Sequence, residues 1–318
     1  MRKKLFAAFA VPLLIMMFLV FTRYTYGDSK GLSIEQLANP SCEEIKLEIA
    51  KKVAEDLGPD YDFDPKSITG LSVYFGNFSE SEENDAIVVI QTVPKEALIV
   101  VYSLVDDEYL FSGMIDRLSN VEGVNFVGLP NIANDMIIIS EMSDQRIGSF
   151  EKGSFLRGYM CVDGDFIHMM DIRTGVESYW NKSWNYAVHD ENIPAESGWD
   201  RIKEISDIKW NGDDFVLILS RDQSLSSSVD KESMHIPDED SFVTSQSRKL
   251  VSRYYWSDKW KRLILKEMIE TETGETVAVI EDFNESPYTL LDGNYEKFMI
   301  LRKDGTTEIV GKNQLEEK

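Results

Sequence analysis

The residue types that most often do chemistry are few in this sequence, and they do not stand at catalytic spacings. The three histidines, His168, His189 and His235, show no H-x-H or H-E-x-x-H pattern, so no zinc site is expected. His168 falls in an apolar run, where a half-buried imidazole with satisfied hydrogen bonds is expected. Neither a G-x-S-x-G elbow nor a glycine-rich phosphate loop is present. The sequence therefore predicts no catalytic residue, no metal ion and no cofactor.

The acidic residues are too numerous to indicate a site by themselves. Among 56 carboxylates, some pair always satisfies the requirement of a glycosidase, so their abundance carries no weight. DYDFDP at 60–65 alternates acids but lacks the glycine and the later glutamate of a calcium loop, and it is expected to be a solvated turn. The formal net charge of −23 repels nucleic acid, and no basic patch is found beyond the first residues. Nucleic acid is therefore not expected as a partner.

One aromatic stretch, SYWNKSWNY at 178–186, has a composition typical of a binding surface. Tyr179, Trp180, Trp184 and Tyr186 place four large rings within a few residues. Exposed rings of this kind stack on sugars or anchor protein contacts, because they bring large rigid area at low entropic cost. The alternative is that the four rings seal a core between two groups of strands. These four residues are the candidate binding residues of the sequence.

The N-terminus predicts export. Arg2, Lys3 and Lys4 precede an uninterrupted apolar run at 5–21, which places the N-terminus in the cytoplasm and the acidic bulk on the far side of a membrane. Residues 1–27 are interpreted as a signal peptide, cleaved after Gly27, or as a retained membrane anchor. The protein is accordingly expected to be secreted or to be held at the cell membrane facing outside.

Residues 28–68 are expected to be a linker followed by one helix. Ser41 and Glu44 have the spacing of a capping box, and an apolar stripe from Ile45 to Leu57 follows at i, i+4 spacing. Cys42 and Cys161 are the only cysteines of the chain. In an oxidising compartment they could pair, and the alternative is two separate buried thiols.

Runs of β-branched and aromatic residues begin at Thr69. NDAIVVIQ at 84–91 and NDMIIISE at 134–141 are near repeats fifty residues apart, and each is the second strand of a predicted group of four. Short polar links separate the strands, so each group is expected to be an antiparallel meander. The predicted strands of the first two groups are 69–75, 85–93, 96–104, 107–115, 124–129, 134–142, 153–162 and 165–172.

A third group begins at 205–210 and 213–220 and is then interrupted. Residues 221–248 are rich in Ser and Asp, and they are predicted to be a polar insert. Two further strands and a fourth group complete the chain. Residues 69–318 are therefore predicted to form a mainly β domain of repeated four-stranded antiparallel meanders, and four-stranded units at a period near fifty are what a β-propeller requires.

The acidic or Asn-rich entry into each second strand resembles the β-propeller repeats of the FG-GAP or VCBS type. The resemblance covers roughly residues 69–310 and implies a β-propeller-like fold. It departs from those repeats because no loop contains their D-x-D-x-D-G calcium run. An open stack of sheets or a β-sandwich pair are the alternatives.

These features favour a non-catalytic extracytoplasmic module that binds a protein or a cell-envelope polymer through loops on a rigid β scaffold. The expected contact elements are the aromatic stretch at 179–186 and the insert at 221–248, and residues 5–21 would contact the membrane. One alternative is an exported hydrolase acting on glycans or peptides, with carboxylates and a tryptophan in one pocket. Another is the ectodomain of a membrane sensory complex.

Overall fold

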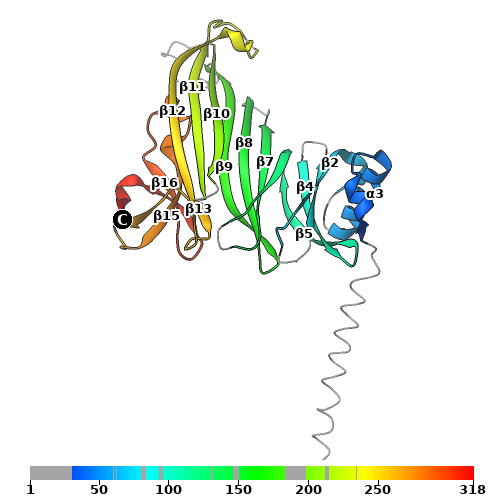
Figure 1. The fold of residues 1–318 in the computed structure, drawn as a ribbon. Helices are drawn as coiled ribbons and strands as arrows, with labels where there is room; N and C mark the ends of the chain where they lie inside the picture. Colours follow the sequence, from blue (N-terminus) through cyan, green and yellow to red (C-terminus); the bar gives the residue numbers. More distant parts are fainter. Residues whose placement is uncertain are drawn as a thin grey trace, which may run out of the picture.

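The computed structural model shows a mainly β protein in which three antiparallel sheets of five, eight and five strands follow one another along the chain (Figure 1). Two helices cover the outer face of the first sheet, and the C-terminus lies at the opposite end of the molecule. The structure describes residues 31–318 except 60, 62, 80–83, 93–95, 130–131, 146–149, 183–197, 212–214 and 234.

The predicted helix is α3 (Glu43–Leu57), and its apolar stripe packs on the first sheet as expected. A shorter helix, α2 (Ile34–Ala38), precedes it. The capping box predicted from Ser41 is wrong, because α3 begins one residue later, after Cys42, whose side chain makes no cap hydrogen bond. A capping box is found instead at α2, where Ser33 and Gln36 bond to each other's main chain.

The first sheet has the strand order β1-β5-β4-β3-β2, so four strands form the predicted meander and β1 adds an edge. Its strands are β1 (Leu32–Ser33), β2 (Ile68–Gly76), β3 (Asp85–Thr92), β4 (Glu96–Val105) and β5 (Glu108–Leu118). The short 3-10 turn η1 (Pro65–Ser67) leads from α3 into β2. This part of the chain agrees closely with the strand pattern of the sequence.

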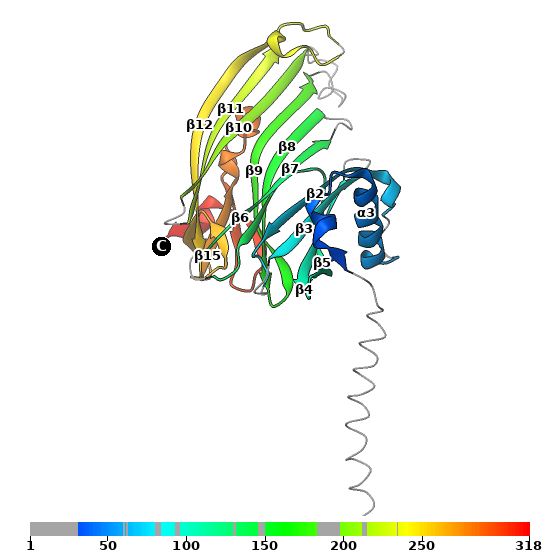
Figure 2. The same cartoon turned by 45° about the vertical axis from the view of Figure 1, so that its right-hand side comes forward.

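The second sheet contains eight strands, and its spatial order from β6 to β13 is also the chain order (Figure 2). Its strands are β6 (Val121–Val127), β7 (Met136–Gln145), β8 (Phe150–Val162), β9 (Asp165–Asn181), β10 (Trp199–Asn211), β11 (Val216–Ser228), β12 (Phe242–Ser257) and β13 (Arg262–Ile264). The longer strands extend well beyond the neighbouring sheets, and the whole sheet is curved.

Separate four-stranded blades are not observed, and the described strands do not form a propeller. The second and third predicted groups join because β9 pairs with β10. The pairing extends from Asn181 opposite Trp199 to Gly175 opposite Ile205. A propeller requires each group to end its sheet at its fourth strand. Here β9 runs on through Tyr179 and Asn181 and offers β10 a long edge to pair with.

The prediction of a polar insert at 221–248 is also wrong for most of its length. Residues 221–228 belong to β11 and 242–248 belong to β12, so only the connection between them, with the 3-10 turn η3 (Glu239–Ser241), lies outside the sheet. Polar side chains here are hydrogen-bonded within the sheet, as between Ser226 and Thr244 at 3.2 Å. Satisfied polar groups allow the polar sequence of 221–228 to form a largely buried strand, whereas 242–248 is mostly exposed.

The third sheet has the order β17-β16-β15-β14-β18, and it lies against one face of the second sheet. Its strands are β14 (Lys266–Glu270), β15 (Thr276–Asp282), β16 (Lys297–Leu301), β17 (Thr307–Gly311) and β18 (Leu315–Glu317). Between β15 and β16 the chain forms a 3-10 turn, η4 (Phe283–Glu285), and a one-turn helix, α4 (Thr289–Asp292). Another 3-10 turn, η5 (Lys312–Gln314), precedes β18.

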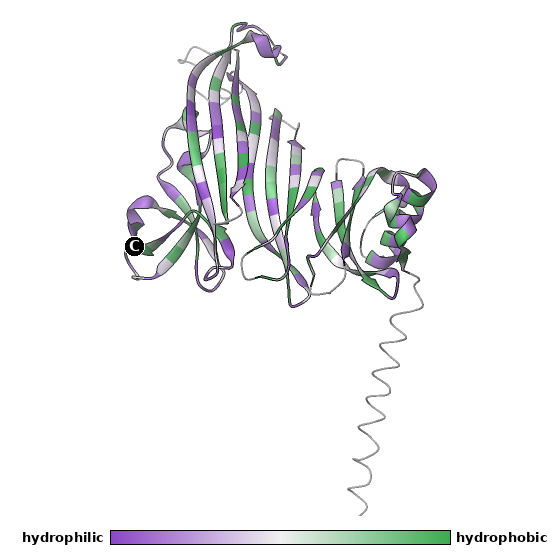
Figure 3. Ribbon diagram, viewed as in Figure 1, coloured by the Kyte–Doolittle hydropathy of each residue, from purple (hydrophilic) through white to green (hydrophobic). Residues whose placement is uncertain are grey.

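The two near-repeats of the sequence are β3 and β7, and both strands are buried on both faces. They share one core between the first and second sheets, where Ile87 and Val89 pack with Ile137 and Ile139. Their other faces pack on α3 and on the rest of the second sheet. Figure 3 shows the contrast with the longer strands of the second sheet, along which hydrophobic and hydrophilic residues alternate.

Within the described residues, no helix is long and apolar enough to cross a membrane. The apolar run at 5–21 and the whole segment 1–27, on which the expectations of export and anchoring rest, lie outside those residues.

Candidate functional site

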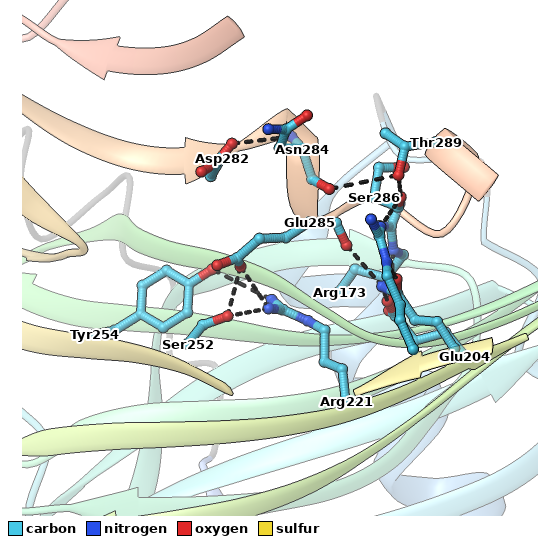
Figure 4. Close-up of polar contacts among 12 residues, drawn as sticks. Arg173, Glu204, Arg221, Ser252, Tyr254, Asp282, Asn284, Glu285, Ser286 and Thr289 are labelled. Carbon is cyan, nitrogen blue, oxygen red and sulfur yellow. Dashed lines mark hydrogen bonds and ion pairs between the residues drawn. The ribbon is translucent and has the colours of Figure 1, made fainter. Parts of the chain in front are cut away.

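Polar side chains of β11 and β12 hold the third sheet in place, as Figure 4 shows. Glu285, in η4, accepts hydrogen bonds from Arg221 Nη1 at 2.7 Å and from Ser252 Oγ at 2.5 Å. Arg221 also donates to Ser252 and, at 3.4 Å, to the hydroxyl of Tyr254. The Arg221 side chain is only 7% exposed and that of Glu285 is 25% exposed. Removing one partner of such a pair leaves the other as a buried charge without a counter-charge, which lowers the free energy of unfolding by about 3–5 kcal/mol.

A second set of bonds centres on Gln223, on the same face of β11. Its amide nitrogen donates to the main-chain carbonyl of Glu285 at 2.6 Å and to the carboxylate of Glu204. Its amide oxygen accepts from Arg248 Nε at 2.6 Å, and Arg248 Nη2 donates to the carbonyl of Ser286 at 2.7 Å. Two main-chain carbonyls of the β15–β16 connection are therefore held by side chains of the second sheet, which fixes how the two sheets meet.

A partly open cavity of about 370 Å³ lies between the docked sheets and is here called the inner cavity. Charged side chains from both sheets line it. Its guanidinium groups are those of Arg173, Arg221 and Arg262. Its carboxylates are those of Asp171, Glu281, Asp282 and Glu285. Such a volume lies within the range of pockets that hold small molecules.

Two β-bulges face the inner cavity from opposite sides. In β9 the extra residue is Met169, between the paired residues His168 and Met170. In β15 it is Ile280, just before Glu281. A bulge interrupts the alternation of a strand and re-aims the adjacent side chains. The bulges account for the way in which consecutive residues of β9 and of β15, among them His168 and Glu281, line one cavity.

Most charges of the inner cavity are neutralised by a partner. The pairs are Arg221 with Glu285, Arg173 with Glu204 at 3.3 Å, Asp171 with Arg157 at 2.6 Å, and Asp282 with Lys312 at 2.9 Å. Arg262 and Glu281 have no such partner among the described residues. The cavity therefore carries one unpaired cation from the second sheet and one unpaired carboxylate from the third.

Arg262 and Glu281 are held differently. Arg262 donates from Nε to the carbonyl of Met169 at 3.0 Å and from Nη2 to the carbonyl of His168 at 3.2 Å, which fixes the guanidinium in the cavity wall. Burial raises the pKa of Glu281, the nearby charge of Asp171 adds to this rise, and Arg173 opposes it. A carboxylate in this setting is more costly to ionise than one in water.

His168 is half-buried in β9, as the sequence predicts, but its hydrogen bonds are not all satisfied. Its Nε2 is buried and has no hydrogen-bond partner, and its ring lies 5.1 Å from the ring of Tyr159. Burial lowers the pKa of His168, so its neutral form is favoured. The inner cavity thus also contains a neutral imidazole.

A larger groove of about 940 Å³ shares Arg262, Met169 and His168 with the inner cavity and is open to solvent; it is here called the basic groove. Its apolar lining includes Met160, Ile167, Met169, Trp256, Trp260 and Leu301. Its cations are Lys259, Lys261, Arg262, Arg302 and Lys303, and Asp163 is its one carboxylate. A protein with a formal net charge of −23 therefore gathers five cations around one groove.

Some of these cations are positioned by acids just outside the groove. Glu267 accepts hydrogen bonds from Lys259 at 2.5 Å and from Trp260 Nε1 at 2.7 Å, and Lys259 lies over the Trp260 ring, 4.7 Å from its centre. Arg302 bonds to Glu270 at 2.7 Å on the side of β14. Arg262 and Lys303 form no ion pair with a described residue, so their charge is available to a ligand.

The prediction that no basic patch follows the first residues of the chain is wrong, because five cations line the basic groove. The signals were two short runs, Lys259-Trp260-Lys261-Arg262 and Arg302-Lys303, forty residues apart. Each run alone is unremarkable beside the acidic excess. Docking of the third sheet brings the β16–β17 turn beside the β12–β13 turn and joins them.

The candidate aromatic residues do not form one cluster. Trp180 packs against the buried cluster of Val176, Ile202 and Leu225. Tyr179, its neighbour on β9, lies on the other face, with its ring 5.6 Å from that of Phe242. Successive side chains of a strand point to opposite faces, which explains the separation. Trp184 and Tyr186 lie outside the described residues.

The chain matches no protein-family model, and no curated protein matches its sequence. The resemblance to FG-GAP or VCBS repeats gains no support from these comparisons. The function must therefore be argued from the site itself.

The two cysteines lie far apart in the fold, one before α3 and one in β8. Cys42 is exposed before α3 and Cys161 is buried in β8, and no disulfide joins them. Among the described residues, no group of His, Cys, Asp and Glu is arranged to hold a metal ion.

Proposed function

We propose that this protein is a non-catalytic binding module that works outside the cytoplasm and holds an acidic segment of a partner protein in the basic groove. The observation that carries the proposal is the concentration of Lys259, Lys261, Arg262, Arg302 and Lys303 around one apolar groove of a strongly acidic protein. The acidic surface elsewhere repels an anionic partner, so attraction is confined to the groove, which favours one binding register.

The apolar lining favours a polypeptide over a purely hydrophilic polymer. Ile167 is 43% exposed, and Trp256 is half-buried in the groove wall, so apolar side chains of a ligand would cover surface that now contacts water. Acidic residues between those apolar side chains would meet the cations of the rim. Tryptophan and arginine together are the residues most enriched where binding energy is concentrated. An anionic cell-envelope polymer would pair with the cations of the rim but would leave the apolar lining of the groove uncovered.

The extracytoplasmic location rests on the apolar run at 5–21 and the basic residues before it. In this proposal the run directs the chain across a membrane and either anchors it there or is removed. The module then faces partners outside the cell or in its envelope.

Features expected of a hydrolase are divided between two places. Among the described lining residues, the inner cavity has four carboxylates and no tryptophan, and the basic groove has two tryptophans and one carboxylate. Three of the four cavity carboxylates are in ion pairs. The arrangement thus favours binding over glycan hydrolysis.

The test is binding of fluorescent peptides to the purified protein, measured by anisotropy at several salt concentrations. The probe is a twelve-residue peptide that alternates Glu and Leu, compared with an all-Glu peptide and with inorganic polyphosphate. Charge reversal at Lys259, Lys261 and Lys303 to Glu should weaken binding of the Glu-Leu peptide by at least about tenfold, because three attractive contacts become repulsive. Lys209→Glu and Lys231→Glu, at exposed positions that do not line the groove, are the matched controls.

Equal loss in the control variants would show a general charge effect and would contradict a groove site. Tighter binding of polyphosphate than of the Glu-Leu peptide would assign the groove to a polymeric anion. Trp256→Ala distinguishes the two, because it should weaken peptide binding more than polyphosphate binding.

A further inference from the structure

The inner cavity shares Arg262 with the basic groove, but it also contains an unpaired carboxylate that the basic groove does not explain. Glu281 lines the inner cavity but not the basic groove. All the other acids of the cavity have a cationic partner, and all its other cations have an acidic one. The unpaired groups are therefore one guanidinium, on Arg262, and one carboxylate, on Glu281.

The two unpaired groups come from different sheets and are fixed independently. Arg262 begins β13 and is anchored by the carbonyls of His168 and Met169. Glu281 belongs to β15 and follows the bulge at Ile280. Arg262 and Glu281 are both half-buried. A chain that needed only to dock the two sheets would pair these opposite charges or replace them by apolar residues, because partial burial of an unpaired charge is unfavourable. Their separation across a cavity leaves each one to be satisfied by something else.

We propose that the inner cavity binds a small zwitterion of the amino-acid class, with its carboxylate at Arg262 and its ammonium group at Glu281. A guanidinium is suited to a carboxylate because its N–H groups match the two oxygens, and a carboxylate accepts the N–H bonds of an ammonium group. The imidazole of His168, which burial keeps neutral, adds no further charge to the lining of the cavity. The volume of about 370 Å³ accommodates an amino acid or a dipeptide.

The charge balance selects this class over singly charged ligands. A carboxylate alone would satisfy Arg262 and leave Glu281 unpaired, and an amine alone would do the reverse. Each of those ligands would gain one contact and leave the other half-buried charge as it is in the unliganded protein, so each should bind much more weakly. A zwitterion satisfies both groups at once.

The experiment is a thermal-shift and calorimetric titration of the purified protein with glycine, alanine, leucine and dialanine, against acetate and methylamine as single-charge probes. Amino acids or dialanine should raise Tm and bind, and acetate and methylamine should not. Alanine and dialanine separate a site for free amino acids from one for short peptides. Binding of acetate as tight as that of alanine would overturn the proposal, as would no binding of any zwitterion at ~10 mM, a concentration above the Kd of specific small-ligand sites.

Variants locate the site. Glu281→Gln should weaken zwitterion binding at least about tenfold, because the ammonium group loses its ionic partner. Glu272→Gln, at an exposed position of the third sheet outside the cavity, is the matched control and should bind like the parent. Unchanged binding in Glu281→Gln would overturn the proposal.

Arg262→Met tests the other end of the ligand. It also removes the bonds to two carbonyls of β9, and it could destabilise the fold. Arg262→Lys keeps the charge but loses the fork of N–H donors, and it should bind more weakly than the parent and more tightly than Arg262→Met. Arg253→Met, at an exposed position of β12, is the control.

The inner cavity and the basic groove are separable in these tests. Reversal of Lys259, Lys261 and Lys303 should leave zwitterion binding unchanged, because none of these lysines lines the cavity. Glu281→Gln should leave peptide binding in the groove unchanged. Failure of one proposal is therefore distinguishable from failure of the other.

Discussion

The hydroxyl of Tyr159, on β8, donates a hydrogen bond of 2.5 Å to Asp116 Oδ2, on β5, and so connects the second sheet to the first. The Tyr159 side chain is otherwise packed in the apolar core that the two sheets share. Burial raises the pKa of Tyr159, and its bond to Asp116 adds to this effect, so the phenol stays protonated and remains a donor.

Tyr159→Phe should lower the free energy of unfolding by about 1.5–3 kcal/mol, because a hydrogen bond to a charged acceptor is lost while the ring still fills its place. Urea unfolding followed by tryptophan fluorescence measures this change. Tyr61→Phe, at an exposed tyrosine, is the control and should change the stability by less than about 0.5 kcal/mol. A Tyr159→Phe variant as stable as the parent would show that the bond does not hold the sheets together.

Arg221 and Glu285 should show strong energetic coupling. Arg221→Met or Glu285→Gln alone is expected to cost about 3–5 kcal/mol, because each leaves its partner as a buried charge. The double variant should cost clearly less than the two single costs added. A double-mutant cycle by urea unfolding gives the coupling, and the exposed pair Arg117–Glu96 should give about 0–1 kcal/mol in the same cycle.

Glu281→Gln should raise the stability of the unliganded protein at pH 7. Burial raises the folded-state pKa of Glu281, and Asp171 adds to the rise while Arg173 and Arg221 oppose it. The ionised carboxylate therefore destabilises the fold above that raised pKa, and the penalty disappears as the pH falls towards the ordinary pKa of a glutamate. The Tm difference between variant and parent should be positive at pH 7 and vanish near pH 4.5, the ordinary value for this group.

The same pH series with Glu272→Gln should show no such convergence, because Glu272 is exposed and faces no cavity. If Glu281→Gln is less stable than the parent at pH 7, then the carboxylate stabilises the fold. The idea that the ionised Glu281 lowers the stability of the unliganded protein would then be wrong.

Lys249→Val should promote self-association. β12 pairs with β11 along its length but with β13 only over Tyr255–Ser257, so most of its outer edge is unpaired. Lys249 is exposed there, and charged residues on an edge strand prevent pairing with another chain. Light scattering as a function of concentration should show larger species for Lys249→Val than for Lys209→Val, a matched change on an interior strand.

The helix and the first two groups of strands could be predicted because their apolar patterns match their burial. Val88 and Ile137 stand in continuous apolar runs, which is typical of strands covered on both faces. The strand at 221–228 could not be predicted, because Arg221 and Gln223 bury polar groups that are satisfied by Glu285, far away in the chain. The strand at 242–248 could not be predicted because it is polar and mostly exposed. A polar strand of this kind cannot be distinguished from a loop by its sequence.

The candidate site was harder to predict than the fold. The basic groove requires residues 259–262 and 302–303 to meet, and the inner cavity requires residues of β9, β13 and β15. Both depend on how the third sheet docks on the second, which is decided by bonds such as that between Arg248 and the carbonyl of Ser286. The hydrophobic periodicity of a single segment cannot predict a contact between two distant segments. Within the aromatic stretch at 179–186, Tyr179 and Trp180 lie on opposite faces of β9, because neighbouring residues of one strand face apart.

From β6 to β13, each strand of the second sheet pairs with the strand that follows it in the chain. Such a sheet can grow by adding one hairpin at a time, without waiting for a distant segment, and low sequence separation between partners favours fast folding. A chain that emerges with its N-terminus first could therefore assemble this sheet while its C-terminal part is still unfolded. The third sheet differs, since its β14 edge is completed only by β18, the last strand to appear. The inner cavity and the basic groove would then be the last parts of the molecule to form, after the scaffold is already in place.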